Sequence, residues 1–189
     1  MKFFPILFLC ILACEVTAQT DGFRTNAFYD GYIIHTDGSR ERGFVQYLNE
    51  EDRYEKVVFR KEQNGKKLKY KVKDLNGYMV AETTYRAVEY EDVLFKGRKF
   101  LIVENEGCIN TYSYTERKDD GTWATITILE NDNRAVNTQK FALNFSNSMA
   151  ELVQDDADLA AKVAAKQKGY RILSMYDIVE EYNENCKNK

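Results

Sequence analysis

The chain has 189 residues, of which 44% are hydrophobic and 30% charged, and its formal net charge is -3. This composition is typical of a globular protein and excludes an intrinsically disordered one. The net charge is too small to predict a partner, and the length suits one domain with a sizeable core. We therefore expect a single folded domain after any targeting segment.

Residues 1–18 have the anatomy of a secretory signal peptide. A lysine follows the initial methionine, residues 3–13 form an apolar run too short to span a bilayer, and Val16-Thr17-Ala18 matches a small-residue cleavage site. Cleavage after Ala18 predicts a mature domain of residues 19–189 that is secreted or periplasmic, without a transmembrane segment.

A lipoprotein signal is the alternative interpretation of the same leader. Ile11-Leu12-Ala13 precedes Cys14, which would then carry a lipid and anchor the chain to the outer membrane. Leu12 fits that motif poorly, and the conventional cleavage site follows four residues later. N-terminal sequencing distinguishes the two, because a mature chain that begins at Gln19 excludes the lipid anchor.

Cleavage leaves two of the four cysteines, Cys108 and Cys186. In an oxidising compartment a lone pair of cysteines is more often bonded than free. The sequence therefore predicts a disulfide between positions 78 apart, joining the middle of the β-region to the C-terminal tail. The alternative, two thiols that never meet, stays open because the sequence does not give their separation.

Residues 28–145 show short apolar runs broken by turn signals, which is typical of a β-rich domain. Asp37-Gly38 is the strongest hairpin signal, and a two-residue turn there pairs Thr36 with Ser39. That register puts these residues on the core face: Phe28, Tyr32, Ile34, Val45 and Tyr47. It puts Tyr29, Ile33 and Phe44 on the wetter face beside His35. A last strand is expected to carry Phe141, Leu143 and Phe145.

Asp120-Gly121 predicts a second hairpin of the same kind. Pairing Asp119 with Thr122 places Tyr112, Tyr114 and Trp123 on one face, together with Thr125 and Thr127. Flat aromatic rings near hydroxyl groups suit the apolar faces of sugars, so these three aromatic residues form a candidate ligand platform. The alternative is that C-terminal helices cover this face.

The period of the apolar residues becomes helical after residue 146. Ser148 to Glu151 match a capping box, Asp155-Asp156 indicate a second helix start, and residues 175–185 form a helix with Ser174 as its cap. The predicted fold class is α+β: a largely antiparallel twisted sheet or open β-barrel, built as a meander over residues 28–145, with two to three C-terminal helices over residues 147–186.

Candidate catalytic chemistry is sparse. His35 is the only histidine, and a solvated position at the hairpin tip is the favoured interpretation. No nucleophile, zinc or phosphate-loop motif is present, so we expect no catalytic residue, no metal site and no cofactor. Carboxylates such as Glu89, Glu91 and Asp92 could include the carboxylate pair that a glycosidase needs. Asp155, Asp156 and Asp158 suit the start of a helix, where negative charge is favourable.

A lysine stripe runs from Arg60 to Lys73, with Leu68, Tyr70 and Val72 alternating between the lysines. It could attract an anionic partner, although secretion argues against nucleic acid. The favoured interpretation is a solvated edge strand, because lysines keep such an edge from pairing with another chain.

Three segments resemble a family of secreted β-rich proteins of Bacteroidota whose function is unknown. They are Gly31 to Val45, GYIIHTDGSRERGFV; Tyr70 to Tyr78, YKVKDLNGY; and Asp177 to Asn183, DIVEEYN. The resemblance implies an envelope protein with a β-rich front and a helical tail, and it implies no reaction. Those proteins often have a cysteine in the first helical segment where this chain has Asp155 or Asp156, so the family's disulfide scheme does not carry over.

We therefore expect a secreted or periplasmic, non-catalytic binding or structural protein of the cell envelope, whose partner is an envelope protein or a glycan. The alternative is a secreted hydrolase that acts on glycans with paired carboxylates.

Overall fold

The computed structural model describes residues 22–91, 96–132 and 134–187. The predicted leader, with Ala18 and Cys14, lies outside these residues, as does Asp92. The strands are β1 Phe28–His35, β2 Arg40–Gln46, β3 Lys56–Arg60, β4 Leu68–Lys71, β5 Leu75–Val80, β6 Thr83–Glu91, β7 Lys96–Asn105, β8 Asn110–Arg117, β9 Trp123–Glu130 and β10 Ala135–Asn137. The α-helices are α1 Phe145–Leu152, α2 Ala157–Ala164 and α3 Met175–Lys187.

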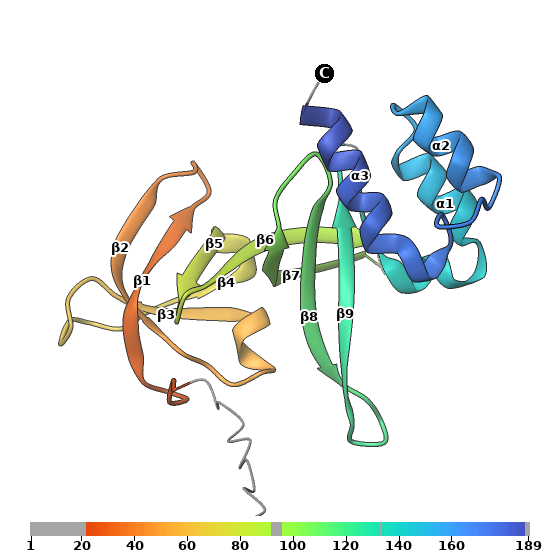
Figure 1. Ribbon diagram of the computed structural model, residues 1–189. Helices are drawn as coiled ribbons and strands as arrows, with labels where there is room; N and C mark the ends of the chain where they lie inside the picture. The colour runs from red at the N-terminus through yellow and green to blue at the C-terminus, as the bar shows by residue number, and fades with distance from the viewer. Residues whose placement is uncertain (1–21, 92–95, 133, 188–189) are drawn as a thin grey trace, which may run out of the picture.

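All ten strands belong to one sheet, in the order β10-β9-β8-β7-β6-β5-β1-β2-β3-β4. The pairing is antiparallel except at one point, where Val136 of β10 also pairs in parallel with Glu91 of β6. This bridge closes β6 to β10 into a small ring, while β5 and β1 to β4 continue the sheet beyond it. Figure 1 shows these outer strands on one side of the ring and the helices on the other. The predicted α+β class with a largely antiparallel sheet is confirmed.

Both Asp-Gly hairpins have loops of three residues rather than two. The His35 carbonyl accepts a hydrogen bond from the Gly38 amide at 2.9 Å, and the Lys118 carbonyl accepts one from the Gly121 amide at 2.9 Å. The glycines have φ of +84° and +83°, the left-handed conformation that this type of loop requires. In each loop the aspartate carboxylate accepts hydrogen bonds from the amide and hydroxyl of the residue two positions on.

The extra loop residue shifts the register by one position, so the face predicted for β1 is wrong, whereas Val45 and Tyr47 lie on the core side as predicted. Tyr29 pairs with Val45 and Ile33 with Glu41. The residues on the core side are therefore Tyr29, Ile33, Val45 and Tyr47, whereas Phe28, Tyr32 and Ile34 turn to the other face. His35 lies opposite Ser39, and its Nε2 is 3.2 Å from a carboxylate oxygen of Glu41, so it is not simply a solvated tip residue.

The described residues form two apolar cores, one on each side of the β8–β9 hairpin. The larger core lies inside the sheet and collects residues from β1 through β10, including the fully buried Phe59, Leu75 and Phe100. The smaller core lies between the helices and the outer face of the hairpin, where Ile109 and Leu129 meet residues such as Met149. The helices thus cover only one end of that outer face, as Figure 1 shows for α3.

Two predictions at the start of the helical tail are wrong. Phe141, Leu143 and Phe145 do not form a strand: residues 138–143 make a 3-10 helix and Phe145 begins α1. Because α1 starts at Phe145, Ser148 lies within the helix and caps nothing. A run of three alternating apolar residues is too short to separate a strand from two successive helical turns.

The predicted start of the second helix and the predicted last helix are confirmed, whereas the predicted cap Ser174 lies inside a 3-10 turn. Asp156 caps α2, because its carboxylate accepts a hydrogen bond from the Leu159 amide at 3.1 Å. The last helix is α3, with Ile178, Val179 and Tyr182 buried in the smaller core. A short 3-10 turn of residues 172–174 leads into it.

The predicted disulfide between Cys108 and Cys186 is present, with 6.5 Å between the two Cα atoms. It fastens α3 to the turn between β7 and β8. Beside it, the buried Asn183 side chain accepts a hydrogen bond from the Ile109 amide at 2.7 Å and donates one to the Ile109 carbonyl at 2.9 Å. Gly107 is required here, since a Cβ would lie 2.6 Å from the Asn183 side chain.

Candidate functional site

The second hairpin also differs from its predicted register, and this separates the three residues of the candidate platform. Tyr112 pairs with Ile128 and Tyr114 with Ile126, so both tyrosines point into the larger core and are only 4% and 3% exposed. Trp123 pairs with Arg117 on the opposite face and is 49% exposed. The three aromatic residues therefore do not form one platform, and the helices do not bury Trp123.

The outer face that carries Trp123 is hollowed beside α3. The hollow has a volume of about 460 Å³ and is called the α3 groove below. It is lined by Glu104, Asn105, Thr111, Ser113, Thr125, Thr127, Tyr176, Val179 and Glu180. Thr111 and Ser113 are buried at its floor, while Glu104, Thr125 and Tyr176 are exposed on its walls. A volume of this size is within the range of small-molecule sites.

The pleat of the sheet explains why hydroxyl groups gather there. Alternate residues of β8 and β9 face outward, and in the middle of the hairpin these are Thr111 and Ser113 opposite Leu129 and Thr127. At the end away from the hairpin tip, Ile109 and Leu129 are apolar and lie under the helices. Toward the tip the same face is polar and open, so the groove begins where helical cover ends.

Two contacts fix the polar groups of the groove. The Ser113 hydroxyl donates a hydrogen bond to the Glu104 carboxylate, which joins the floor to the end of β7. The hydroxyls of Thr127 and Tyr176 lie 3.0 Å apart, which joins the sheet to α3. These contacts leave oxygen atoms of a carboxylate and several hydroxyls facing the groove, where they can accept and donate hydrogen bonds.

Trp123 extends the groove along β9. Because side chains alternate, Trp123, Thr125 and Thr127 lie on one face in succession, with Trp123 nearest the hairpin tip. Tyr176, 57% exposed, stands at the other end on α3. The hydroxyl-lined hollow is thus flanked by two exposed aromatic rings.

Sequence reasoning found part of this site and missed the rest. It selected Trp123, Thr125 and Thr127, but it grouped them with the wrong tyrosines. Tyr176 could have been noticed, since it is an aromatic residue off the apolar stripe of its helix. No sequence pattern marks Glu104 or Glu180 as a site residue. Only the pairing of β7 with β8 and the position of α3 place these two glutamates in the groove.

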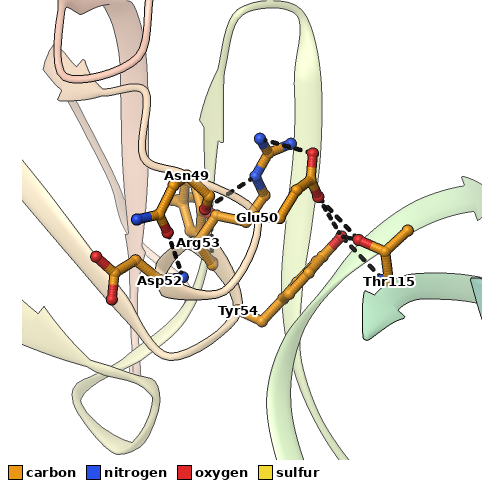
Figure 2. Close-up of polar contacts among 7 residues, drawn as sticks. Asn49, Glu50, Asp52, Arg53, Tyr54 and Thr115 are labelled. Carbon is orange, nitrogen blue, oxygen red and sulfur yellow. Dashed lines mark hydrogen bonds and ion pairs between the residues drawn. The ribbon is translucent and has the colours of Figure 1, made fainter. Parts of the chain in front are cut away.

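A second polar cluster lies between β2 and β3, in a segment that contains a short 3-10 helix of residues 52–54 (Figure 2). Figure 2 shows Arg53 and Tyr54 meeting Glu50, with Thr115 of β8 on the other side. Arg53 pairs with Glu50 at 3.0 Å, and the Thr115 hydroxyl donates to the same carboxylate at 2.8 Å. The Thr115 amide donates to the Tyr54 hydroxyl at 3.1 Å.

This cluster serves the fold. The pairing of β8 with β7 ends at Ser113, so the Thr115 amide takes Tyr54 as its partner in place of a neighbouring strand. Burial raises the pKa of Tyr54, so its hydroxyl stays protonated at neutral pH and acts only as a hydrogen-bonding group. The cluster fastens the segment after β2 to β8.

Of the carboxylates considered as a glycosidase pair, Glu89 and Glu91 form surface ion pairs. Glu89 pairs with Arg98 at 3.9 Å and Glu91 with Lys140 at 3.1 Å. Within residues 22–91, 96–132 and 134–187, no group of three or more His, Cys, Asp or Glu side chains could hold a metal ion. In the same part of the chain, no helix is long and apolar enough to cross a membrane.

The fold and the groove define an α+β protein with an open polar site on the outside of its sheet. No protein-family model, no curated protein and no solved structure matches the chain. The resemblance to secreted proteins of Bacteroidota therefore stays a prediction that depends on the sequence segments alone.

Proposed function

We propose that the chain is an exported, non-catalytic binding protein of the cell envelope whose α3 groove takes a polyhydroxylated ligand such as an oligosaccharide. Export is supported by the signal-peptide pattern of residues 1–18. It is also supported by the disulfide, since bonded cysteines persist in oxidising compartments and are rare in the cytosol.

The chemistry of the groove supports a sugar ligand. Carboxylate and hydroxyl groups hydrogen-bond to sugar hydroxyls, and exposed aromatic rings pack against the apolar faces of sugar rings. Glu104, Ser113 and Thr127 supply the first kind of group, and Trp123 and Tyr176 the second. The observation that carries the proposal is Trp123, a large aromatic side chain 49% exposed on the same face as the hydroxyl-lined hollow.

A glycan hydrolase is the competing function, because Glu104 and Glu180 both line the groove. A glycosidase needs two carboxyl groups in unlike surroundings, so that one is held protonated as the acid. Both of these glutamates are exposed, and Glu104 accepts a hydrogen bond from Ser113. Their similar exposure favours binding without hydrolysis.

The test is a glycan-array screen of the mature protein, followed by calorimetry on the glycans that bind. Trp123→Ala is expected to weaken binding about tenfold, as removal of an aromatic contact does, and to leave the folded structure intact because the side chain is half exposed. Leu68→Ala is the matched control, since it removes an exposed apolar side chain from β4, and it should bind as the unchanged protein does.

Two results would overturn the proposal. One is the absence of any glycan that binds, or equal affinity of the Trp123→Ala variant. The other is release of shorter sugars from a bound glycan that stops in Glu104→Gln or Glu180→Gln, which would establish the hydrolase instead.

A further inference from the structure

Exposed apolar side chains gather at the start of α3. Ile172, Leu173 and Tyr176 are 47%, 98% and 57% exposed, although they lie within five residues of one another. Among the described residues, Leu68 and Trp123 are the other exposed large apolar side chains, and each lies on a strand of its own. Single exposed apolar residues are ordinary, but a group of them marks a surface that interacts with something else.

Ile172 and Leu173 lie at the apex of a tight turn. The Ser174 amide donates a hydrogen bond to the Arg171 carbonyl at 2.8 Å, so Ile172 and Leu173 are the two central residues of that turn. Residues 166–174, which link α2 to α3, are called the apolar turn below. Its apex turns two branched apolar side chains toward water, where they gain nothing for the stability of the fold.

The chain is fixed on both sides of this apex. Before it, Tyr170 packs against the smaller core, and its hydroxyl donates a hydrogen bond to the Glu181 carboxylate at 3.0 Å. After it, Met175 packs against the same core. Two neighbours of the apex are thus turned inward while Leu173 is held outward. The exposure of Leu173 is therefore part of the folded structure and not the result of a frayed end.

Three exposed cations border the apex. They are Lys166, Lys168 and Arg171, and the apolar turn contains no acidic residue. The Arg171 Nε donates a hydrogen bond to the Lys166 carbonyl at 3.3 Å, which brings the two ends of the basic stretch together. None of the three forms an ion pair with a carboxylate of the described residues. The nearest acidic residue in the sequence is Asp177, in the first turn of α3.

This combination selects among the possible partners. An exposed leucine beside unpaired cations suits the boundary between lipid phosphate groups and acyl chains, where each kind of side chain finds a partner. A polyanion dissolved in water offers no contact to Leu173. A stable protein interface covers about 800 Å² of each partner and has few charged residues at its centre, whereas three cations surround two apolar side chains here.

We propose that the apolar turn inserts into the surface of an anionic phospholipid membrane, with Ile172 and Leu173 among the acyl chains and the three cations at the phosphate groups. The exposed Tyr176 then lies at the level of the head groups, a position that tyrosine favours. This inference does not rest on the proposed function, because neither the apex residues nor the cations line the α3 groove.

A fluorescent reporter on the apex tests which part of the protein meets the lipid. Cys108 and Cys186 are joined in the disulfide, so Leu173→Cys gives the mature chain one free thiol for an environment-sensitive dye. Vesicles of phosphatidylcholine and phosphatidylglycerol should shift the dye emission to the blue, as entry into an apolar layer does. The same dye at Leu68→Cys, an exposed position on β4, is the matched control and should not respond.

Co-sedimentation with the same vesicles measures the two contributions. The double variant Ile172→Ser, Leu173→Ser should bind at least about tenfold more weakly, because two apolar side chains no longer leave water. Each cation near an anionic surface contributes about fivefold, so Lys166→Gln, Lys168→Gln, Arg171→Gln should bind roughly a hundredfold more weakly. Binding of the unchanged protein should fall as salt is added.

The control for charge is Lys67→Gln, Lys69→Gln, Lys71→Gln, which removes three cations from β4 and should bind within about twofold of the unchanged protein. Equal losses in the two triple variants, or an equal response of the dye at positions 68 and 173, would overturn the proposal. Unchanged binding of the serine double variant would overturn it in favour of a purely ionic contact. Failure to bind anionic vesicles would overturn it in favour of a protein partner.

Discussion

Tyrosine residues make up an unusual share of the buried side chains. The rings of Tyr78 and Tyr85 stack with centroids 4.4 Å apart and an angle of 4° between their planes. The Tyr78 hydroxyl donates a hydrogen bond to the Arg53 carbonyl at 2.6 Å. Burial raises the pKa of Tyr78 well above its ordinary value, and burial, partly offset by Arg53, raises the pKa of Tyr85 to about 12. These phenols contribute to the core as neutral hydrogen-bonding groups.

The raised pKa values predict alkaline unfolding. A tyrosine with a raised pKa in the folded state gives its full stability below about pH 10, where it is protonated in both states. As the pH rises through the pKa of Tyr85, about 12, that contribution is lost. Between about pH 10 and pH 12 the free energy of unfolding should fall by about 1.4 kcal/mol per pH unit for each tyrosine with such a raised pKa.

Urea unfolding at a series of alkaline pH values measures this slope. Tyr85→Phe should start from a lower stability at neutral pH, because it loses its contact with Arg53, but its stability should fall less steeply above pH 10. Tyr176→Phe is the control, since that side chain is 57% exposed. A slope equal in the two variants would show that Tyr85 does not resist ionisation.

At the scale of the element, the two Asp-Gly hairpins share one design. In each, a glycine with positive φ closes a three-residue loop, and the aspartate before it accepts two hydrogen bonds from the residue after the glycine. These hydrogen bonds lower the pKa of Asp37 and of Asp120. The loops set the register of both hairpins, and through it the face on which every side chain of these strands lies.

Replacing the loop glycine tests this role. Gly121→Ala should cost about 1 kcal/mol of unfolding free energy, because φ is +83° and the only side-chain atom near a new Cβ is an Arg117 nitrogen at 3.7 Å, an ordinary contact. Gly121→Asn should cost less, since asparagine tolerates positive φ better than alanine.

The comparison for this variant is Gly22→Ala, a position with open space and no positive φ. Its unfolding midpoint in urea should stay within a few tenths of a kcal/mol of the unchanged protein. Equal effects of Gly121→Ala and Gly22→Ala would mean that the loop does not hold its conformation.

The same loops show what the sequence predicts and what it does not. Asp37-Gly38 and Asp120-Gly121 correctly mark the turns, because glycine is needed at positive φ whatever the loop length. The Asp-Gly dipeptide occurs in two-residue and three-residue hairpin loops alike, so the loop length was not predictable from it. A change of one residue in the loop length turns the side chains of one strand to the opposite face relative to its partner strand. For this reason Trp123 was selected for the candidate site together with Tyr112 and Tyr114, which are buried. Tyr176 and Glu104 enter the groove only through tertiary packing.

At the scale of the whole molecule, the two cores are joined by the β8–β9 hairpin and by the disulfide. Each helix buries one face in the smaller core. Hydrogen bonds such as that between Asn183 and Ile109 attach the helices to the sheet. Cys186 near the end of α3 and Cys108 beside Ile109 make that attachment covalent.

Removal of the disulfide should therefore weaken the whole fold. For a loop of 78 residues the chain-entropy model gives a loss of about 4.5 kcal/mol in Cys108→Ala, Cys186→Ala. Denaturant unfolding of this variant and of the oxidised protein measures the difference. Labelling of both thiols in the unreduced, denatured protein would contradict the bond itself.

The bridge between Val136 and Glu91 also bears on how copies of this protein can associate. β10 pairs with both β9 and β6, so it does not form an open edge of the sheet. β4 is therefore the only strand of the described sheet that has a single neighbour. A sheet with two open ends can add copies without limit and grow into a fibre, whereas a sheet with one open end can join only one other copy, edge to edge. Edge-to-edge assembly through β4 would therefore give a pair, and the lysines along β4 oppose even that.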